Sequence, residues 1–311
     1  MNTQHNLIII LGPTATGKTR LAANLASELN TEIISADSRQ VYRDMDIGTG
    51  KDLKEYVVNG KQIPFHLINI IEAGEEYNLH FFQRDFFKVY DDILAKNKVP
   101  ILCGGTSLYI NSVLKGHAHT PIPENKQLRL SLDGLTKKEL VDYFLALPET
   151  PYKSKADTST LIRLIRAIEI CTWEQTNTRE ENQSAKKLNP VIFGLDTAIE
   201  IRRKSIEDRL ISRLQNGLVE EVQTLIAKGV SNEKLISYGL EYKFVVMFLQ
   251  KKLTFDEMQK QLIIAIHQFA KRQMTFFRKM EREGAKINWI DSSLSLPEQL
   301  TAINKILNLN S

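Results

Sequence analysis

The sequence predicts an α/β protein in which helices flank a parallel sheet and a second, mainly helical unit is inserted. Short apolar segments alternate with amphipathic ones through the first third of the chain, which is the pattern of strands joined by crossover helices. Near Lys115 the pattern becomes mainly helical, and an apolar β-branched segment returns only at Pro190. We therefore expect a core of residues 1–115 and 190–311 and a helical insertion of residues 116–189.

Composition and charge are those of an ordinary globular protein. The chain has 311 residues, of which 42% are hydrophobic and 25% are charged, and its formal net charge is +4. No segment has the apolar length of a membrane span, and the N-terminus lacks the basic region and cleavage site of a secretory signal. The two cysteines have no metal-type spacing. We therefore expect a cytoplasmic protein without a membrane partner, whose small positive charge permits an anionic partner but does not require one.

The strongest local signal is a glycine-rich segment between a predicted strand, Leu7–Leu11, and a predicted helix. It matches the pattern G-x-x-x-x-G-K-[ST] of ATP-binding and other nucleotide-binding loops. In such a loop the backbone N–H groups, the helix N-terminus and the lysine attract phosphate, and the final hydroxyl contributes to a Mg²⁺ site. The sequence therefore predicts a P-loop NTPase-like sheet that holds phosphate or diphosphate, without indicating which bond is broken. The candidate phosphate-binding residues are Gly12, Pro13, Thr14, Ala15, Thr16, Gly17, Lys18 and Thr19, with Thr19 as the metal ligand.

Two other predicted strands end in polar residues. Residues 32–37 end at Asp37, and residues 99–103 are followed by two glycines and Thr106. Because the carboxyl ends of parallel strands meet at one edge of a sheet, Asp37 and Thr106 are expected near the phosphate loop. An isolated Asp at a strand end is also common as a helix cap or turn former, so both interpretations stay open on these residues alone.

Helical patterns dominate the rest of the chain. One predicted helix, from Asp157 or Thr158 to Thr176, carries Arg163 and Arg166 at neighbouring surface positions. This pair suits either a solvated face or a basic clamp for a phosphodiester backbone. Basic residues in the last turns of the final long helix suit its macrodipole, so part of this charge needs no ligand, but Phe276, Phe277 and Trp289 interleave with it as aromatics do in nucleic-acid binders. The other expected elements are helices at 79–96, at 201–228 with a break near Gly217, and from Phe255 onward, and strands at 64–70 and 190–195.

In order and spacing these motifs resemble the tRNA dimethylallyltransferases, also called tRNA isopentenyltransferases, nearly from end to end of the chain. Each short match is weak alone, but the set is specific. Ser237–Tyr242 departs from the family's commoner Gly-Tyr-basic pattern, and only Gly239 is counted as matched there. Ser107 and Asn69 stand where the family commonly has Gly and Asp, which we interpret as packing changes. The matching segments are Gly12–Thr19, Asp37–Tyr42, Met45–Thr49, Gly104–Tyr109, Arg163–Glu169, Gly217–Val222 and Ala270–Gln273.

The resemblance implies a prenyl transfer. The family moves the dimethylallyl group from dimethylallyl diphosphate to N6 of the adenosine 3′-adjacent to the anticodon in tRNA, giving N6-dimethylallyladenosine and diphosphate, with Mg²⁺ as cofactor. By resemblance, the glycine-rich loop and Arg209 hold diphosphate rather than a nucleoside triphosphate. The implied catalytic residues are Lys18, Asp37 as acceptor of the N6 proton, and Thr106 where base and prenyl donor meet. The positions implied to contact tRNA are Asp37, Ser38, Arg39, Gln40, Thr106, Ile162, Arg163, Leu164, Ile165, Arg166, Lys271 and Arg272.

Three alternative functions remain open on the sequence. A P-loop kinase of a small metabolite would need an acidic metal-orienting residue on a later strand, and the strand at 99–103 has none. A prenyltransferase acting on a free adenine nucleotide would not need the basic, helical second half. A non-catalytic RNA-binding module would not need intact Lys18, Thr19 and Asp37. We therefore expect a monomeric enzyme whose insertion contacts the anticodon stem-loop of tRNA.

Overall fold

The computed structural model describes residues 5–115, 122–177 and 188–308. The chain forms two units, one of residues 1–115 and 188–311 and one of residues 116–187, and each is described by itself below. The boundaries expected from the sequence coincide with this division at the first junction and differ from it by two residues at the second. No helix in the described ranges is both long enough and apolar enough to span a bilayer.

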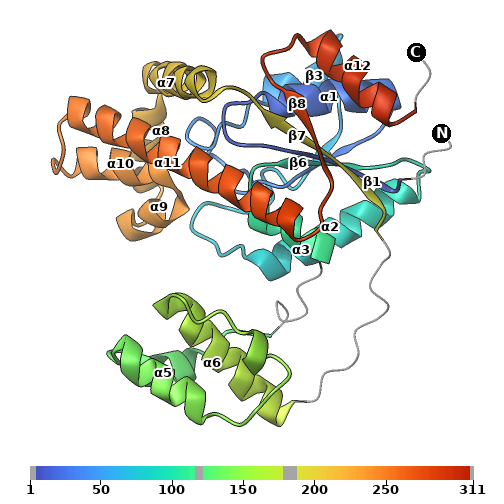
Figure 1. Ribbon diagram of the computed structural model, residues 1–311. Coiled ribbons are helices and arrows are strands. Elements are labelled where there is room, and N and C mark those ends of the chain that lie inside the picture. The colour runs from blue at the N-terminus through green and yellow to red at the C-terminus, as the bar shows by residue number, and fades with distance from the viewer. Residues whose placement is uncertain (1–4, 116–121, 178–187, 309–311) are drawn as a thin grey trace. The chain divides into compact units, whose positions relative to one another are not determined.

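A six-stranded sheet forms the centre of the first unit (Figure 1). Its strands are β1 (Leu7–Leu11), β2 (Ile33–Ser35), β5 (Phe65–His66), β6 (Ile101–Gly104), β7 (Pro190–Asp196) and β8 (Ile287–Asp291). Their order is β5-β2-β6-β1-β7-β8, and every pairing in it is parallel. All five residues of β1 are buried, as its central place between β6 and β7 requires. The predicted fold class, a parallel sheet flanked by helices, is confirmed.

The strand predicted at 64–70 is shorter than expected. β5 ends at His66 because Leu67 and Asn69 adopt left-handed backbone conformations, with φ of 61° and 55°, which interrupt the extended backbone of a strand. A separate antiparallel hairpin of β3 (Val57–Val58) and β4 (Lys61–Gln62) precedes β5.

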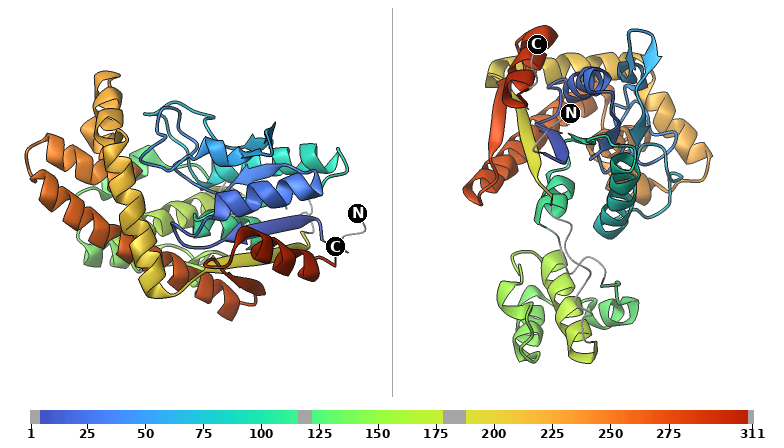
Figure 2. Two further views of the ribbon diagram at one scale, coloured as in Figure 1. Left: turned by 90° about the horizontal axis from the view of Figure 1, so that it is seen from above. Right: turned by 90° about the vertical axis from the view of Figure 1, so that its right-hand side faces the viewer.

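Helices cover both faces of the sheet (Figure 2). Successive side chains of a strand point to opposite faces, so β1 contributes to two cores. Ile8 and Ile10 lie in the first core, and the other three β1 residues lie in the second. The first core is covered by α1 (Lys18–Leu29) and α12 (Leu296–Ile306), and the second by α2 (Leu79–Leu94), α3 (Ser107–Lys115) and the C-terminal part of α11 (Phe255–Arg282).

A third apolar core lies beside the loops that follow β1 and β2. Its helices are α7 (Ile199–Gln215), α8 (Leu218–Ala227), α9 (Asn232–Tyr238), α10 (Leu240–Leu249) and the N-terminal half of α11. Val41, Tyr42 and Met45, from the loop after β2, are buried in the same core. Gly217, with φ of 101°, separates α7 from α8, so the predicted break in this helix is confirmed. These helices form a layer that carries side chains toward the phosphate loop.

The second unit is a small helical domain with its own core. Thr160 caps its last helix and accepts a hydrogen bond from the N–H of Arg163, so the predicted start at Asp157 or Thr158 is wrong. Asp157 instead accepts from the N–H of Ser159 in the preceding turn, which is the competing local use of a short acidic side chain. The helices are α4 (Lys126–Leu132), α5 (Lys137–Ala146) and α6 (Leu161–Thr176), and the buried core residues are Leu132, Leu140, Phe144, Leu164, Ala167, Ile168 and Cys171.

A buried carboxylate beside the start of β2 gives the first unit a measurable acid dependence. Glu32 is 4% exposed, and its carboxylate makes hydrogen bonds of 2.9 to 3.2 Å with Lys96, Lys98 and His66. Burial alone would raise the pKa of Glu32, but these hydrogen bonds outweigh it and lower the pKa to about 2. Because this pKa is lower in the folded state, the stabilisation is complete above the ordinary value of 4.5 and is lost as the pH falls toward 2.

We expect Glu32→Gln to lower the free energy of unfolding by about 2 to 3 kcal/mol at neutral pH and to flatten its decline in acid. Urea unfolding followed by circular dichroism at several pH values measures both effects. Glu72→Gln is the matched control, because it removes only an exposed ion pair with Arg43 and should cost less than about 1 kcal/mol. Equal losses from the two substitutions would contradict the assignment.

Candidate functional site

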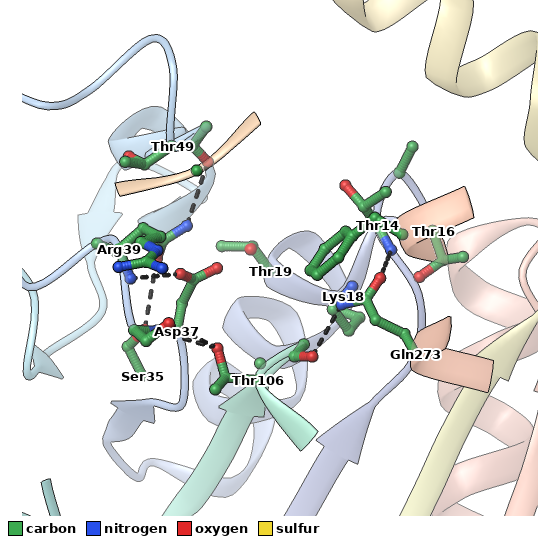
Figure 3. Close-up of a pocket in the computed structure, with 18 of the residues that line it drawn as sticks. Thr14, Thr16, Lys18, Thr19, Ser35, Asp37, Arg39, Thr49, Thr106 and Gln273 are labelled. Atoms are coloured by element: carbon green, nitrogen blue, oxygen red, sulfur yellow. Dashed lines mark hydrogen bonds between the residues drawn. The ribbon is translucent and has the colours of Figure 1, made fainter. Parts of the chain in front are cut away.

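A cavity of about 610 Å³ lies at the carboxyl ends of β1, β2 and β6 (Figure 3). Its walls come from the glycine-rich loop, from the segments that follow β2 and β6, and from α7, α10 and α11. Residues far apart in the sequence meet in it, among them Lys18, Asp37, Thr106, Arg209 and Gln273. The convergence of strand ends that the sequence predicts is therefore present in one site.

The glycine-rich loop is shaped by its backbone geometry. A side-chain carbon at Gly12 would lie 2.4 Å from the carbonyl oxygen of Leu195 in β7, so only glycine allows this close approach. Gly17 has φ of 73° and forms the N-cap of α1, and as a glycine it has no side chain to cap that helix end. The first N–H groups of α1 therefore remain available to an anion in the cavity, and they carry the partial positive charge that attracts one.

Lys18 adds a full positive charge beneath the loop. Its Nζ donates to the carbonyl oxygen of Pro13 at 2.6 Å, and the hydroxyl of Thr16 donates to the same oxygen at 2.9 Å. Burial lowers the pKa of Lys18 to about 8, and the positive charge of Arg209 also lowers this pKa, whereas Asp37 raises it. An anion bound in the loop would favour the charged form of this lysine again.

Asp37 faces the same cavity from the end of β2. Its Oδ1 accepts a hydrogen bond from the N–H of Arg39 at 2.9 Å, which is the local turn common for this residue type. The side chain is half-buried, and in Figure 3 its carboxylate extends into the space that separates it from Thr19. The hydroxyl oxygen of Thr106 accepts from the N–H of Ser38 at 3.0 Å. Asp37 therefore both forms a turn and lines the cavity, so the two interpretations of this residue are compatible.

Gln273 of α11 joins the two glycine-containing turns of the site. Its Nε2 donates to the carbonyl oxygen of Gly105 at 2.8 Å, and its Oε1 accepts from the N–H of Thr14 at 3.0 Å. The residue is 6% exposed. Sequence reasoning gave Gln273 no role, although a polar residue among the buried positions of an amphipathic helix was a usable signal.

Glu221 of α8 fixes the loop that forms another wall. Its carboxylate accepts hydrogen bonds from the N–H groups of Asp46, Ile47 and Gly48 at 2.8, 2.6 and 3.0 Å, and from the hydroxyl of Tyr242 at 2.7 Å. A carboxylate with several backbone donors is a strong, directional anchor. Sequence reasoning missed this residue as well, because the three backbone N–H groups that it binds lie more than 170 positions away along the chain.

Arg209 of α7, which the family resemblance assigns to diphosphate, reaches the glycine-rich loop. Its Nη1 lies 3.5 Å from the hydroxyl oxygen of Thr14, at the limit of a hydrogen bond. Burial lowers the pKa of Arg209 to about 10, and the neighbouring charge of Arg213 contributes to this lowering. Two guanidinium groups therefore lie close together over a loop that already carries a lysine.

The other residues predicted to contact tRNA divide between the two units. Lys271 is exposed on α11 and does not line the cavity. In the second unit, Ile162 is 81% exposed. Arg163 donates to Asp157 at 2.8 Å. The predicted members that line the cavity are Asp37, Ser38, Arg39, Gln40, Thr106 and Arg272.

Leu164 is a correction to the predicted contact set. Its side chain is completely buried in the core of the second unit, because α6 turns this position toward α4 and α5. Ile165 is partly buried beside the same core. Arg166 donates to Glu169 at 3.1 Å and to the carbonyl oxygen of Ile122 at 2.6 Å. These three residues have structural partners within their own unit, and Leu164 is removed from the set.

Comparison with known proteins gives consistent matches. The family model described as IPP transferase matches residues 40–280. A tRNA dimethylallyltransferase 1 of Parabacteroides distasonis is 52% identical, with 98% of each chain covered, and a tRNA dimethylallyltransferase 2 of Phocaeicola vulgatus is 51% identical at the same coverage. The crystal structure of the tRNA isopentenylpyrophosphate transferase of Bacillus halodurans superposes with a TM-score of 0.71 at 28% identity, covering 98% of this chain and 96% of that one.

Proposed function

Because the chain belongs to the IPP transferase family, the tRNA dimethylallyltransferases, we propose that it transfers a dimethylallyl group from dimethylallyl diphosphate to tRNA. The acceptor is N6 of the adenosine 3′-adjacent to the anticodon. The observation that carries the proposal is the meeting of a phosphate-binding loop and an accessible carboxylate in one cavity. The loop holds the diphosphate leaving group, and Asp37 accepts the proton of the N6 amine.

The residues of the cavity suit both halves of this reaction. The allylic C–O bond of the donor breaks, and its electron pair leaves with the diphosphate. Lys18, Arg209 and the N–H groups of the loop stabilise that negative charge. The new C–N bond forms at N6, and the N6 proton passes to the carboxylate of Asp37, which makes the weakly nucleophilic amine reactive. The hydroxyl oxygen of Thr106 accepts a hydrogen bond from the N–H of Ser38, and Thr106 and Asp37 line the same cavity. The proposal assigns Thr106 to the place where base and prenyl donor meet.

Mg²⁺ fits this site as a cofactor shared with the substrate. Within residues 5–115, 122–177 and 188–308, no group of three or more His, Cys, Asp or Glu side chains is arranged to hold a metal ion. Mg²⁺ often takes few protein ligands and completes its shell with substrate phosphates and water. Thr19 lines the cavity at the start of α1 and offers one hydroxyl ligand. When bound, the ion neutralises charge on the diphosphate.

tRNA binding is assigned to basic and polar groups of both units. Arg39, Gln40 and Arg272 line the cavity, and Lys271 adds an exposed positive charge next to it in sequence. In the second unit, Ile162 and Arg163 are the exposed members of the predicted set. A base in a single-stranded anticodon loop leaves its stack at low cost, so it can enter a cavity of this size. The proposal retains the expectation of a monomer acting in the cytoplasm.

The decisive experiment incubates the protein with unmodified tRNA, dimethylallyl diphosphate and Mg²⁺ and analyses the nucleosides by mass spectrometry. The expected result is one added dimethylallyl group on the adenosine next to the anticodon. Parallel reactions contain free AMP in place of tRNA, or ATP with release of ADP as the readout. Modification of AMP but not of tRNA, or hydrolysis of ATP without prenylation, would contradict the proposal.

The pKa of Lys18 leads to a pH prediction for donor binding. Because burial lowers this pKa to about 8, the free protein loses the lysine charge as the pH rises above 8. We expect the dissociation constant of inorganic diphosphate to rise by up to about tenfold per pH unit above that value. Isothermal titration calorimetry between pH 6.5 and 9.5 measures this dissociation constant. Lys18→Arg, which stays charged throughout, should remove the dependence, and an unchanged profile in that variant would assign it to another group.

A further inference from the structure

Arg213 is a buried cation whose hydrogen bonds are incomplete. It lies one helical turn beyond Arg209 on α7 and lines the cavity. Its Nη1 lies 3.5 Å from the carbonyl oxygen of Gly48 and 3.3 Å from Oε1 of Glu241. Its Nη2 is buried and has no hydrogen-bond partner among the described residues. A buried guanidinium nitrogen without a partner is costly, so its presence indicates a group that binds there.

The two arginines of α7 converge on one point. A side-chain carbon at Gly50 would lie 1.8 Å from Nη2 of Arg213 and 2.1 Å from Nη2 of Arg209. The two nitrogens therefore lie side by side above the glycine. Like charges held this close repel each other and destabilise the empty site. Among the described residues, Arg213 is paired with one carboxylate, that of Glu241 in the first turn of α10, and Arg209 has no ion pair. The two positive charges are therefore balanced by one paired carboxylate, and a further anion would complete the balance.

We propose that Arg213 is a second diphosphate-binding arginine, which presents Nη2 to the substrate beside Arg209 while Glu241 positions its guanidinium. The inference rests on the proposed function and extends it to a residue outside the motifs of the sequence. A prenyl diphosphate fits this pair better than an RNA phosphodiester for two reasons. The first is that diphosphate carries more negative charge than a single phosphodiester. The second is that the Arg213 side chain is only 13% exposed and lies beside Arg209, which reaches Thr14 of the phosphate loop.

Binding of inorganic diphosphate, measured by calorimetry, tests the proposal without turnover. Arg213→Met should raise the dissociation constant of diphosphate about 10- to 100-fold, because charge-assisted hydrogen bonds are lost. It should raise the KM for the prenyl donor similarly and leave the dissociation constant of tRNA within about twofold of the original. Glu241→Gln should weaken diphosphate binding less, through loss of positioning. Arg203→Met is the matched control on the exposed side of α7 and should change neither constant.

Arg213→Lys keeps a positive charge near Glu241, so the protein should remain folded. Because lysine lacks the Nη2 group, this variant should bind diphosphate more weakly than the original protein. Unchanged diphosphate affinity in folded Arg213→Met or Arg213→Lys overturns the inference, as does a loss confined to tRNA affinity. Failure of the unmodified protein to prenylate tRNA would instead overturn the proposed function. The binding assay and the prenylation assay therefore separate the two failures.

Discussion

Asp37→Asn is expected to lower the rate of prenyl transfer about 10²- to 10⁴-fold, the range typical of a lost general base. The amide keeps the size of the side chain and an oxygen for the N–H of Arg39, so the turn after β2 should persist. It cannot take the proton from N6. Single-turnover reactions with saturating tRNA and dimethylallyl diphosphate measure the chemical step separately from binding.

The binding constants supply the control for this substitution. Because the amide leaves the phosphate loop intact, diphosphate affinity should change by no more than a few-fold, and tRNA affinity likewise. Asp52→Asn removes another carboxylate from the cavity wall and should leave the rate within about fivefold. A full rate in Asp37→Asn, or an equal loss in both variants, would rule out proton transfer to Asp37.

Local patterns predicted the parts of the fold whose causes are local. The apolar β-branched segment Leu7–Leu11 became the central strand, because its length and composition suit a strand buried on both faces. The pattern around Lys18 and Thr19 specified the loop, since its glycines, helix start and charge are contiguous. The strand ends at Asp37 and Thr106 met because parallel strands place their carboxyl ends at one edge.

Long-range contacts were beyond reach of the same reasoning. The hydrogen bond between Gln273 and Thr14 joins residues that are 259 positions apart, and the hydrogen bond between Glu221 and Gly48 joins residues that are 173 positions apart. Strand β8 was not predicted, because only Ile287 and Ile290 of its five residues are buried and it has no continuous apolar run. Such features depend on which elements the tertiary fold brings together, and that choice leaves little trace in a local pattern.

The second unit depends on one buried carboxylate, which makes Glu169 the position of largest expected effect on stability. Its side chain is 1% exposed. It accepts hydrogen bonds from Nε and Nη2 of Arg129 at 2.7 and 3.0 Å, from Arg166 at 3.1 Å, and from the N–H of Asn125 at 3.0 Å. Burial alone would raise the pKa of Glu169, but these partners lower it, so the stabilisation is complete above the ordinary value of 4.5 and falls in acid.

Glu169→Ala leaves two arginines without their shared anion and should cost about 3 to 5 kcal/mol. A domain of this size has a total stability of roughly 4 to 11 kcal/mol, so much of it would be lost. Hydrogen exchange should show lost protection in α4 and α6, while β1 and β6 stay protected. Glu149→Gln, which removes only an exposed partner of Lys153, should leave protection unchanged.

The same variant tests what the second unit does. If this unit contacts tRNA, Glu169→Ala should weaken tRNA binding and leave diphosphate binding unchanged, because every residue of the diphosphate cavity belongs to the first unit. Weakened binding of both ligands would mean that the two units do not unfold independently. Undiminished tRNA affinity with α6 unprotected would remove Ile162 and Arg163 from the proposed contact set, since their positions depend on that helix.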